Sequence, residues 1–184
     1  MKRAGGNTPV IGIAGWKKSG KTTLVTRLIA EFAARGLKVA TVKHAHHEFQ
    51  IDDAETDSAR HRRAGAGQVA IVSAGRWAIV SELRGASEPT LDAVIARLDP
   101  CHLVIVEGYK SAPIPKIETR RRAAVRPTTL AGEDPNFIAI AADHPTDGQG
   151  LPVFSLDDVA GIADFVAATL GVGAAPQTSS PSAK

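Results

Sequence analysis

The eight residues GWKKSGKT, at positions 15–22, constrain the fold of this 184-residue chain more than any other segment. They fit the pattern G-x-x-x-x-G-K-[ST], in which a glycine-rich loop turns its backbone N–H groups toward phosphate oxygens. An apolar run, Val10–Ala14, precedes the loop, and an amphipathic helical pattern, Lys21–Arg35, follows it. Because strand, loop and helix in this order are the context that the motif requires, we predict a phosphate-binding site here.

Two side chains of the loop have direct chemical roles in such a site. Lys21 places a positive charge on the β- and γ-phosphates of a nucleotide, and the Thr22 hydroxyl is a ligand for Mg²⁺. The neighbouring Lys17 and Lys18 either contact phosphate or are solvated.

A second element of the site is predicted farther along the chain, where four apolar residues at 103–106 are followed by Glu107. An acid at the end of a buried strand can hold Mg²⁺ directly or through water, the alternative being an exposed acid in a turn.

Short apolar runs alternate with helical patterns, which predicts an α/β fold with a mainly parallel sheet flanked by helices. Five strands are expected, at Val10–Ala14, Leu37–Lys43, Leu103–Val106, Phe137–Ala141 and Pro152–Phe154. Four helices are expected, at Lys21–Arg35, Asp57–Ala64, Thr90–Leu98 and Asp157–Leu170. The runs Val69–Ser73 and Trp77–Leu83 predict an antiparallel hairpin extension. We expect a flexible N-terminus at 1–9, one nucleotide-binding domain over 10–170, and a disordered tail at 171–184.

Polar residues gather after the second expected strand. The histidines are His44, His46 and His47, and the aspartates beyond them are Asp52, Asp53 and Asp57. The histidine run fits a transition-metal site, a switch-like loop that faces the nucleotide, or an ordinary polar loop. One or more of the aspartates can join the Mg²⁺ shell.

Asp143 ends another apolar run. A carboxylate at a strand end can accept hydrogen bonds from guanine N1–H and N2–H₂, which adenine lacks in that arrangement; the alternative is a turn aspartate.

The chain has two arginine clusters. They are Arg60–Arg63, which contains Arg62, and Arg120–Arg122. They fit contacts with phosphates of a second substrate, with an acidic partner, or with solvent only.

Composition excludes several classes of protein. A net charge of +3 and an aromatic content of 4% argue against nucleic-acid binding. No run reaches the roughly 18 apolar residues of a membrane span. The single cysteine excludes a disulfide framework, and residues 1–9 lack the apolar core of a signal peptide. We therefore expect a cytoplasmic protein.

Four strings in order along the chain, GWKKSGKTTLVTRLI, VATVKHAHH, DSARHRRAGA and VIVEGYKSAPIPKIE, resemble the molybdopterin-guanine dinucleotide biosynthesis adaptor family (MobB). The resemblance covers roughly residues 10–154. It implies a Rossmann-like P-loop NTPase fold that binds GTP, usually as a homodimer, with at most weak hydrolysis. It also implies a partner guanylyltransferase, which joins GMP to molybdopterin, and it leaves open whether molybdopterin itself binds this chain.

The resemblance also assigns residues by position. The nucleotide loop would comprise Gly15, Trp16, Lys17, Lys18, Ser19, Gly20, Lys21, Thr22 and Thr23. The cleft would be lined by His44, His46, His47, Asp52 and Asp57, and closed by Glu107, Gly108 and Lys110. Two alternatives use the same loop: a metallochaperone-type GTPase that delivers a metal through the histidine run, and a small-molecule kinase.

Overall fold

The computed structural model describes residues 8–45, 55–125 and 128–173. Their contacts divide into two compact units, one containing residues up to His44 together with residues from Val94 onward, the other Ala45–Ala93. Each unit is described by itself, and a single domain over residues 10–170 stays a prediction. No helix within the described ranges is long and apolar enough to cross a membrane. The predicted N-terminal and C-terminal segments lie largely outside the described residues.

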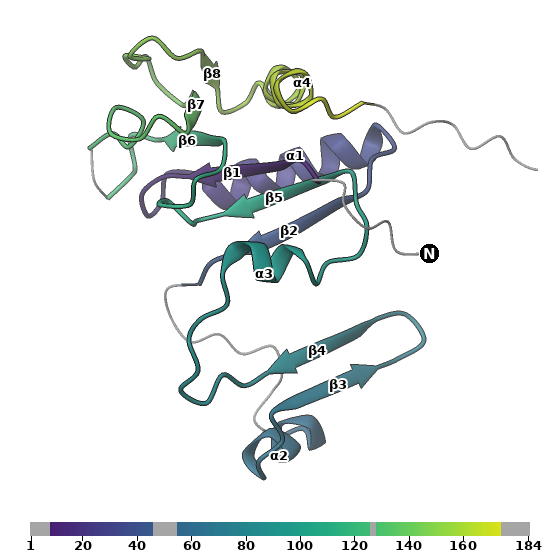
Figure 1. The fold of residues 1–184 in the computed structure, drawn as a ribbon. Coiled ribbons are helices and arrows are strands. Elements are labelled where there is room, and N and C mark those ends of the chain that lie inside the picture. The colour runs from purple at the N-terminus through teal and green to yellow at the C-terminus, as the bar shows by residue number, and fades with distance from the viewer. Residues whose placement is uncertain (1–7, 46–54, 126–127, 174–184) are drawn as a thin grey trace, which may run out of the picture. The chain divides into compact units, whose positions relative to one another are not determined.

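The first unit is built on a six-stranded sheet in the order β2-β5-β1-β6-β7-β8 (Figure 1). All five pairs of neighbouring strands are parallel, which confirms the expected fold class. The carboxyl ends of these strands therefore share one edge, where ligands bind in folds of this kind. The strands are β1 (Val10–Ala14), β2 (Val39–Lys43), β5 (Leu103–Glu107), β6 (Lys116–Arg120), β7 (Phe137–Ala142) and β8 (Val153–Ser155).

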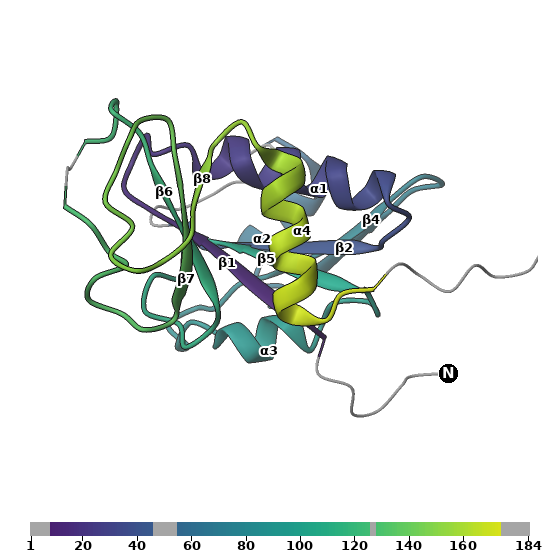
Figure 2. The same ribbon diagram turned by 90° about the horizontal axis from the view of Figure 1, so that it is seen from above.

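Two helices cover one face of this sheet, α1 (Lys21–Ala34) and α4 (Val159–Leu170), as Figure 2 shows. Apolar residues of α1 recur at helical spacing, so one stripe of the helix is buried. That stripe packs with α4 and with the inward side chains of the strands in one core. Its fully buried members include Ile11, Ile13, Leu28, Phe32, Ile105, Ile117 and Ile162. Asp158 caps α4 by accepting a hydrogen bond from the Gly161 N–H at 3.0 Å.

The second unit holds the predicted hairpin. Helix α2 (Asp57–Arg63) precedes strands β3 (Gln68–Val72) and β4 (Trp77–Ser81), which pair antiparallel as a separate two-stranded sheet. Thr56 caps α2 by accepting from the Ala59 N–H at 3.3 Å. The boundary between the units in the sequence, between Ala93 and Val94, falls within helix α3 (Leu91–Ile95).

Strand β6 is the element that sequence reasoning missed. Its residues read Lys-Ile-Glu-Thr-Arg, a pattern that predicts an exposed segment, yet all five are buried. Burial is possible because the charges are paired. Glu118 accepts from the Arg120 guanidinium at 2.8 Å. The Lys116 ammonium donates to the carbonyls of Lys110 and Ala112, both at 2.8 Å, and pairs with Asp134.

The buried Glu118 gives a stability test of this strand. Its carboxylate also accepts from the N–H groups of Leu130 and Ala131, so replacing it leaves the Arg120 charge buried without its partner. We expect Glu118→Gln to lower the free energy of unfolding by about 3–5 kcal/mol in urea melts. The exposed Glu133→Gln, which changes the net charge equally, should stay within about 0.5 kcal/mol. A loss below about 1 kcal/mol in Glu118→Gln would contradict this role.

Candidate functional site

The loop between β1 and α1, residues 15–20, forms a cradle. Its backbone shape requires glycine at two positions, Gly15 and Gly20. At Gly15 a Cβ would collide with the side-chain oxygens of Ser19 and Thr119 and lie 2.7 Å from the Thr119 carbonyl oxygen. Gly20 has φ 97° and Lys18 has φ 66°, so the chain passes twice through the left-handed region. Helix α1 begins immediately afterwards at Lys21, and its N-terminal end adds a positive potential to the cradle.

The interior of the cradle is anchored by hydroxyl hydrogen bonds. The Ser19 and Thr119 hydroxyl oxygens lie 2.7 Å apart, and Thr119 also donates to the Ala14 carbonyl at 3.2 Å. Ser19 and Thr119 are almost fully buried. Thr119 belongs to β6, so its role could not be found without that strand.

Three strand ends bring the chemical groups together at the mouth of the cradle. The parallel register places Ile13 and Lys43 opposite Glu107, the last residue of β5. The Thr22 hydroxyl donates to Glu107 Oε1 at 2.7 Å, and Lys43 Nζ lies 3.5 Å from the same oxygen. Hydroxyl and carboxylate oxygens are the ligands that Mg²⁺ prefers, so Thr22 and Glu107 fit a magnesium site.

Lys21 lies at the centre of an excess of positive charge. Its Nζ donates to the Trp16 carbonyl at 2.9 Å, across the loop. Burial lowers the pKa of Lys21; Glu107 raises it, while Lys110 and Lys43 lower it further. Three lysines thus act around one carboxylate, an arrangement that favours a polyphosphate anion.

Other predicted residues of the first unit lie around this cradle. The Trp16 indole N–H donates to the Thr128 carbonyl at 2.6 Å, and Lys110 Nζ lies 3.8 Å from the centre of the indole ring. Gly108 has φ 93°, and a Cβ there would lie 3.2 Å from His44 Cβ. His44 also donates its N–H to the Glu107 carbonyl at 3.0 Å. Lys17, Lys18 and Thr23 are exposed.

Asp143 follows β7 at the same edge of the sheet. Its Oδ1 accepts from the Arg122 N–H at 3.0 Å and lies 2.7 Å from His144 Nδ1. The hydrogen bond with His144 lowers the pKa of Asp143, and the positive charge of Arg121 acts in the same direction. The carboxylate is therefore held ionised, as a base-reading acceptor needs to be.

Several predicted residues are not placed at the cradle. His46, His47 and Asp52 lie outside the described residues. Asp57 and Arg62 belong to the second unit, where Asp57 pairs with Arg60 at 3.4 Å and Arg62 with Glu82 at 3.1 Å. No cluster of three or more metal-ligating His, Cys, Asp or Glu residues occurs in the described parts of the chain.

The prediction from sequence missed one contributor to the cradle, Lys43, and named Arg121 only as a member of an arginine cluster. Lys43 ends β2 directly after the buried Val42, and its position at a strand end beside Glu107 is the signal that could have identified it. The Arg121 side chain lies against Gly20, where its Nε would be 2.8 Å from an added Cβ. Arg121 follows β6, whose end was not recognised as part of the sheet edge.

Comparisons with known proteins show the family of this chain. Residues 10–143 match the model of the family described as "Molybdopterin guanine dinucleotide synthesis protein B" (MobB). The chain is 37% identical over 161 residues to the molybdopterin-guanine dinucleotide biosynthesis adapter protein of Escherichia coli, covering 86% of this chain and 91% of the relative. It is also 37% identical to the adapter protein of the same name in Haemophilus influenzae, over 86% of this chain and 87% of that one.

Solved structures show the same similarity. A crystal structure of molybdopterin-guanine biosynthesis protein B matches with a TM-score of 0.67 at 29% identity, covering 88% of this chain and 99% of the other. The crystal structure of Bacillus subtilis MobB matches with a TM-score of 0.68 at 27% identity, over 88% and 98%. The family match and the curated relatives together show that the chain belongs to the MobB family of molybdopterin-guanine dinucleotide biosynthesis adapter proteins.

Proposed function

We propose that this protein binds GTP with Mg²⁺ in the cradle and supports a guanylyltransferase that joins GMP to molybdopterin. The observation that carries the proposal is the convergence of Lys21, Thr22 and Glu107, with Lys43 and Lys110 beside them. This group provides a cation excess for the phosphates and two oxygen ligands for the metal. The family assignment supplies the pathway in which such a nucleotide is used.

An accessory role fits the cradle better than fast hydrolysis. Rapid hydrolysis of GTP needs a group that positions water and a cation that stabilises the transition state. No glutamine follows the Glu107-Gly108 turn in the sequence. Arg121 follows β6 and lies against Gly20 of the loop, whereas the pair of Thr22 and Glu107 lies toward β5, on the other side of β1. We therefore propose at most slow turnover by the protein alone.

The first prediction concerns Lys21, the main side-chain charge of the cradle. We expect Lys21→Ala to weaken GTP binding by roughly 2–4 kcal/mol, because a charge-assisted contact with the phosphates is lost. Titration of a fluorescent GTP analogue measures the dissociation constant. Lys38→Ala, an exposed lysine remote in sequence from the loop, is the matched control. An unchanged dissociation constant in Lys21→Ala would reject the cradle as the nucleotide site.

The second prediction concerns the base. We propose that Asp143 accepts hydrogen bonds from guanine, with His144 and the Arg122 N–H holding its carboxylate in place. Competition titrations should show that GTP binds at least ~10-fold more tightly than ATP, and that Asp143→Ala removes most of this preference, since a hydrogen bond to a charged group contributes roughly 1.5–3 kcal/mol. Asp147→Ala, on the following loop, is the control. Equal binding of GTP and ATP by the wild type would refute base reading by Asp143.

The third prediction concerns the hairpin of the second unit, which we propose as the dimer interface. One face of β3 and β4 carries exposed apolar side chains, including Val72 (76% exposed), Trp77 (63%) and Ile79 (53%), which the pairs Val72–Trp77 and Ala70–Ile79 bring together. An unpartnered apolar face of this kind favours association.

Light scattering should therefore give about twice the 19.2 kDa chain mass for the wild type. Ile79→Asp should shift the mass to that of a monomer, because a charge is placed in the apolar face. Arg76→Asp, in the turn between the strands, should leave the dimer intact. A monomeric wild type at micromolar concentration would count against the proposal.

A further inference from the structure

The segment between β7 and β8, residues 143–152, begins with Asp143 and contains neither helix nor strand. Because such a segment lacks the hydrogen-bond ladder of a sheet, its position depends on contacts with side chains of neighbouring elements. Arg120, the last residue of the adjacent strand β6, makes several of these contacts.

Arg120 holds the beginning of this segment at two points. Its backbone carbonyl accepts from the Asp143 N–H at 3.2 Å. Farther along the segment, its Nη1 donates to the Thr146 hydroxyl at 3.0 Å and to the Asp147 carbonyl at 2.9 Å. One residue of β6 thus braces the stretch from Asp143 to Asp147 at both ends.

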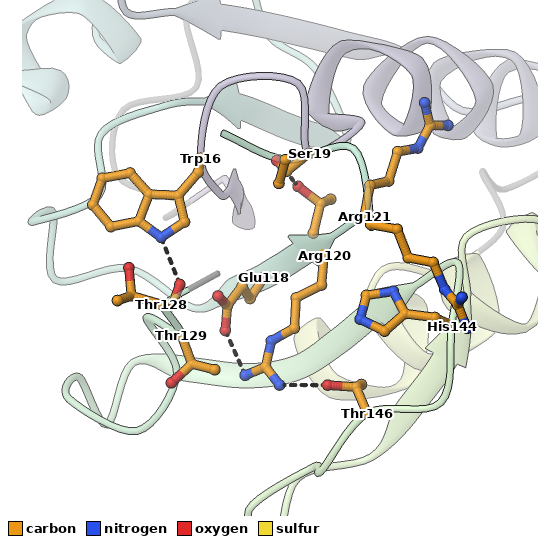
Figure 3. Close-up of a pocket in the computed structure, with 12 residues that line it drawn as sticks. Trp16, Ser19, Glu118, Arg120, Arg121, Thr128, Thr129, His144 and Thr146 are labelled. Carbon is orange, nitrogen blue, oxygen red and sulfur yellow. Dashed lines mark hydrogen bonds and ion pairs between the residues drawn. The ribbon is translucent and has the colours of Figure 1, made fainter. Parts of the chain in front are cut away.

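The charge of Arg120 is compensated by a buried carboxylate. Its Nη2 donates to Glu118 Oε2 at 2.8 Å, and only 9% of Arg120 is exposed. Figure 3 shows the guanidinium between Glu118 and Thr146. A neutralised guanidinium acts on its surroundings mainly by geometry, since its planar fork fixes several acceptors at once.

The position of His144 depends on this brace. His144 Nδ1 lies 2.7 Å from Asp143 Oδ1, so the imidazole ring helps to hold that carboxylate. Pro145 stands between His144 and Thr146. A proline has a fixed φ and also restricts the residue before it, so a tether at Thr146 restrains His144 as well.

Arg120 also lies next to the proposed nucleotide site. Together with Ser19 of the phosphate loop and His144, it lines a cavity of about 180 Å³. Arg122, whose N–H is the other partner of Asp143, lines the same cavity. This space therefore connects the phosphate loop with the groups that hold Asp143.

We propose that Arg120 is a positioning residue for guanine selection, which braces the segment after β7 and thereby holds the Asp143 carboxylate where the base meets it. A carboxylate selects guanine only when it faces N1–H and N2–H₂ together, because hydrogen bonds weaken steeply when their geometry is poor. The inference rests on the proposed function in one respect, the contact of Asp143 with guanine.

The test compares the dissociation constants of GTP and ATP, measured by competition with a fluorescent nucleotide in the presence of Mg²⁺. Arg120→Lys keeps a positive charge beside Glu118 but loses the planar fork. We expect it to lower the preference for GTP over ATP at least ~5-fold, with the ATP constant within about twofold of the wild type. A merely structural role would weaken both nucleotides together, and that result would overturn the proposal.

A milder variant and a matched control accompany Arg120→Lys. Thr146→Val removes only the hydroxyl acceptor and should lower the preference for GTP at least ~3-fold, even where Arg120→Lys folds poorly. In the control, Arg35→Lys removes a guanidinium fork that donates to Glu31 and Asp164 at the far end of α1. It should leave the preference within about twofold. An unchanged preference in either folded test variant, or an equal loss in Arg35→Lys, would overturn the proposal.

Asp143→Ala separates this inference from the proposed function. If the wild type binds GTP and ATP equally, or if Asp143→Ala keeps the preference, the base contact itself is wrong and the brace fails with it. If Asp143→Ala loses the preference, the base contact holds and the brace variants decide the inference alone.

The double variant tests whether Arg120 acts through Asp143. In the Asp143→Ala background, Arg120→Lys should change the GTP dissociation constant by less than about twofold, because a positioning residue has no effect once its target is removed. A larger loss would show that Arg120 acts on nucleotide binding by another route, and would overturn the proposal.

Discussion

The parallel pairing of β1 with β5 on one side and β6 on the other is the constraint on which the site depends. It places the end of β1, and hence the phosphate loop, between two strand ends of different chemistry. Glu107 at the end of β5 contacts Thr22 and Lys43, which creates the side of the cradle where we propose that Mg²⁺ binds. Thr119 near the end of β6 holds Ser19, which fixes the loop on its other side.

The sequence predicted the part of this arrangement that depends on local patterns. The loop motif and its flanking strand and helix follow from residues close together in the chain, and the structure confirms β1 and α1 at the expected places. The apolar run before Glu107 likewise predicted a buried strand, and Glu107 lies beside Thr22 as a shared site requires.

The parts that were missed depend on pairing between distant residues. Strand β6 reads as polar, and its burial follows only from partners such as Asp134, 18 residues away from Lys116. Without β6, neither Thr119 nor Arg121 could be assigned to the sheet edge. Asp57 and Arg62 pair with Arg60 and Glu82 within the second unit, and their predicted roles in the cleft stay predictions.

The central proposal is that the protein holds GTP in the cradle and does not turn it over rapidly, and steady-state phosphate release tests this proposal most directly. Purified protein is supplied with GTP and Mg²⁺, with and without the molybdenum cofactor guanylyltransferase. We predict a rate of about 10⁻⁴–10⁻² s⁻¹ for the protein alone, the range of sites that lack a complete set of water-positioning and charge-stabilising groups. A rate above about 1 s⁻¹ without the partner, in the usual range of enzymes, would contradict the account.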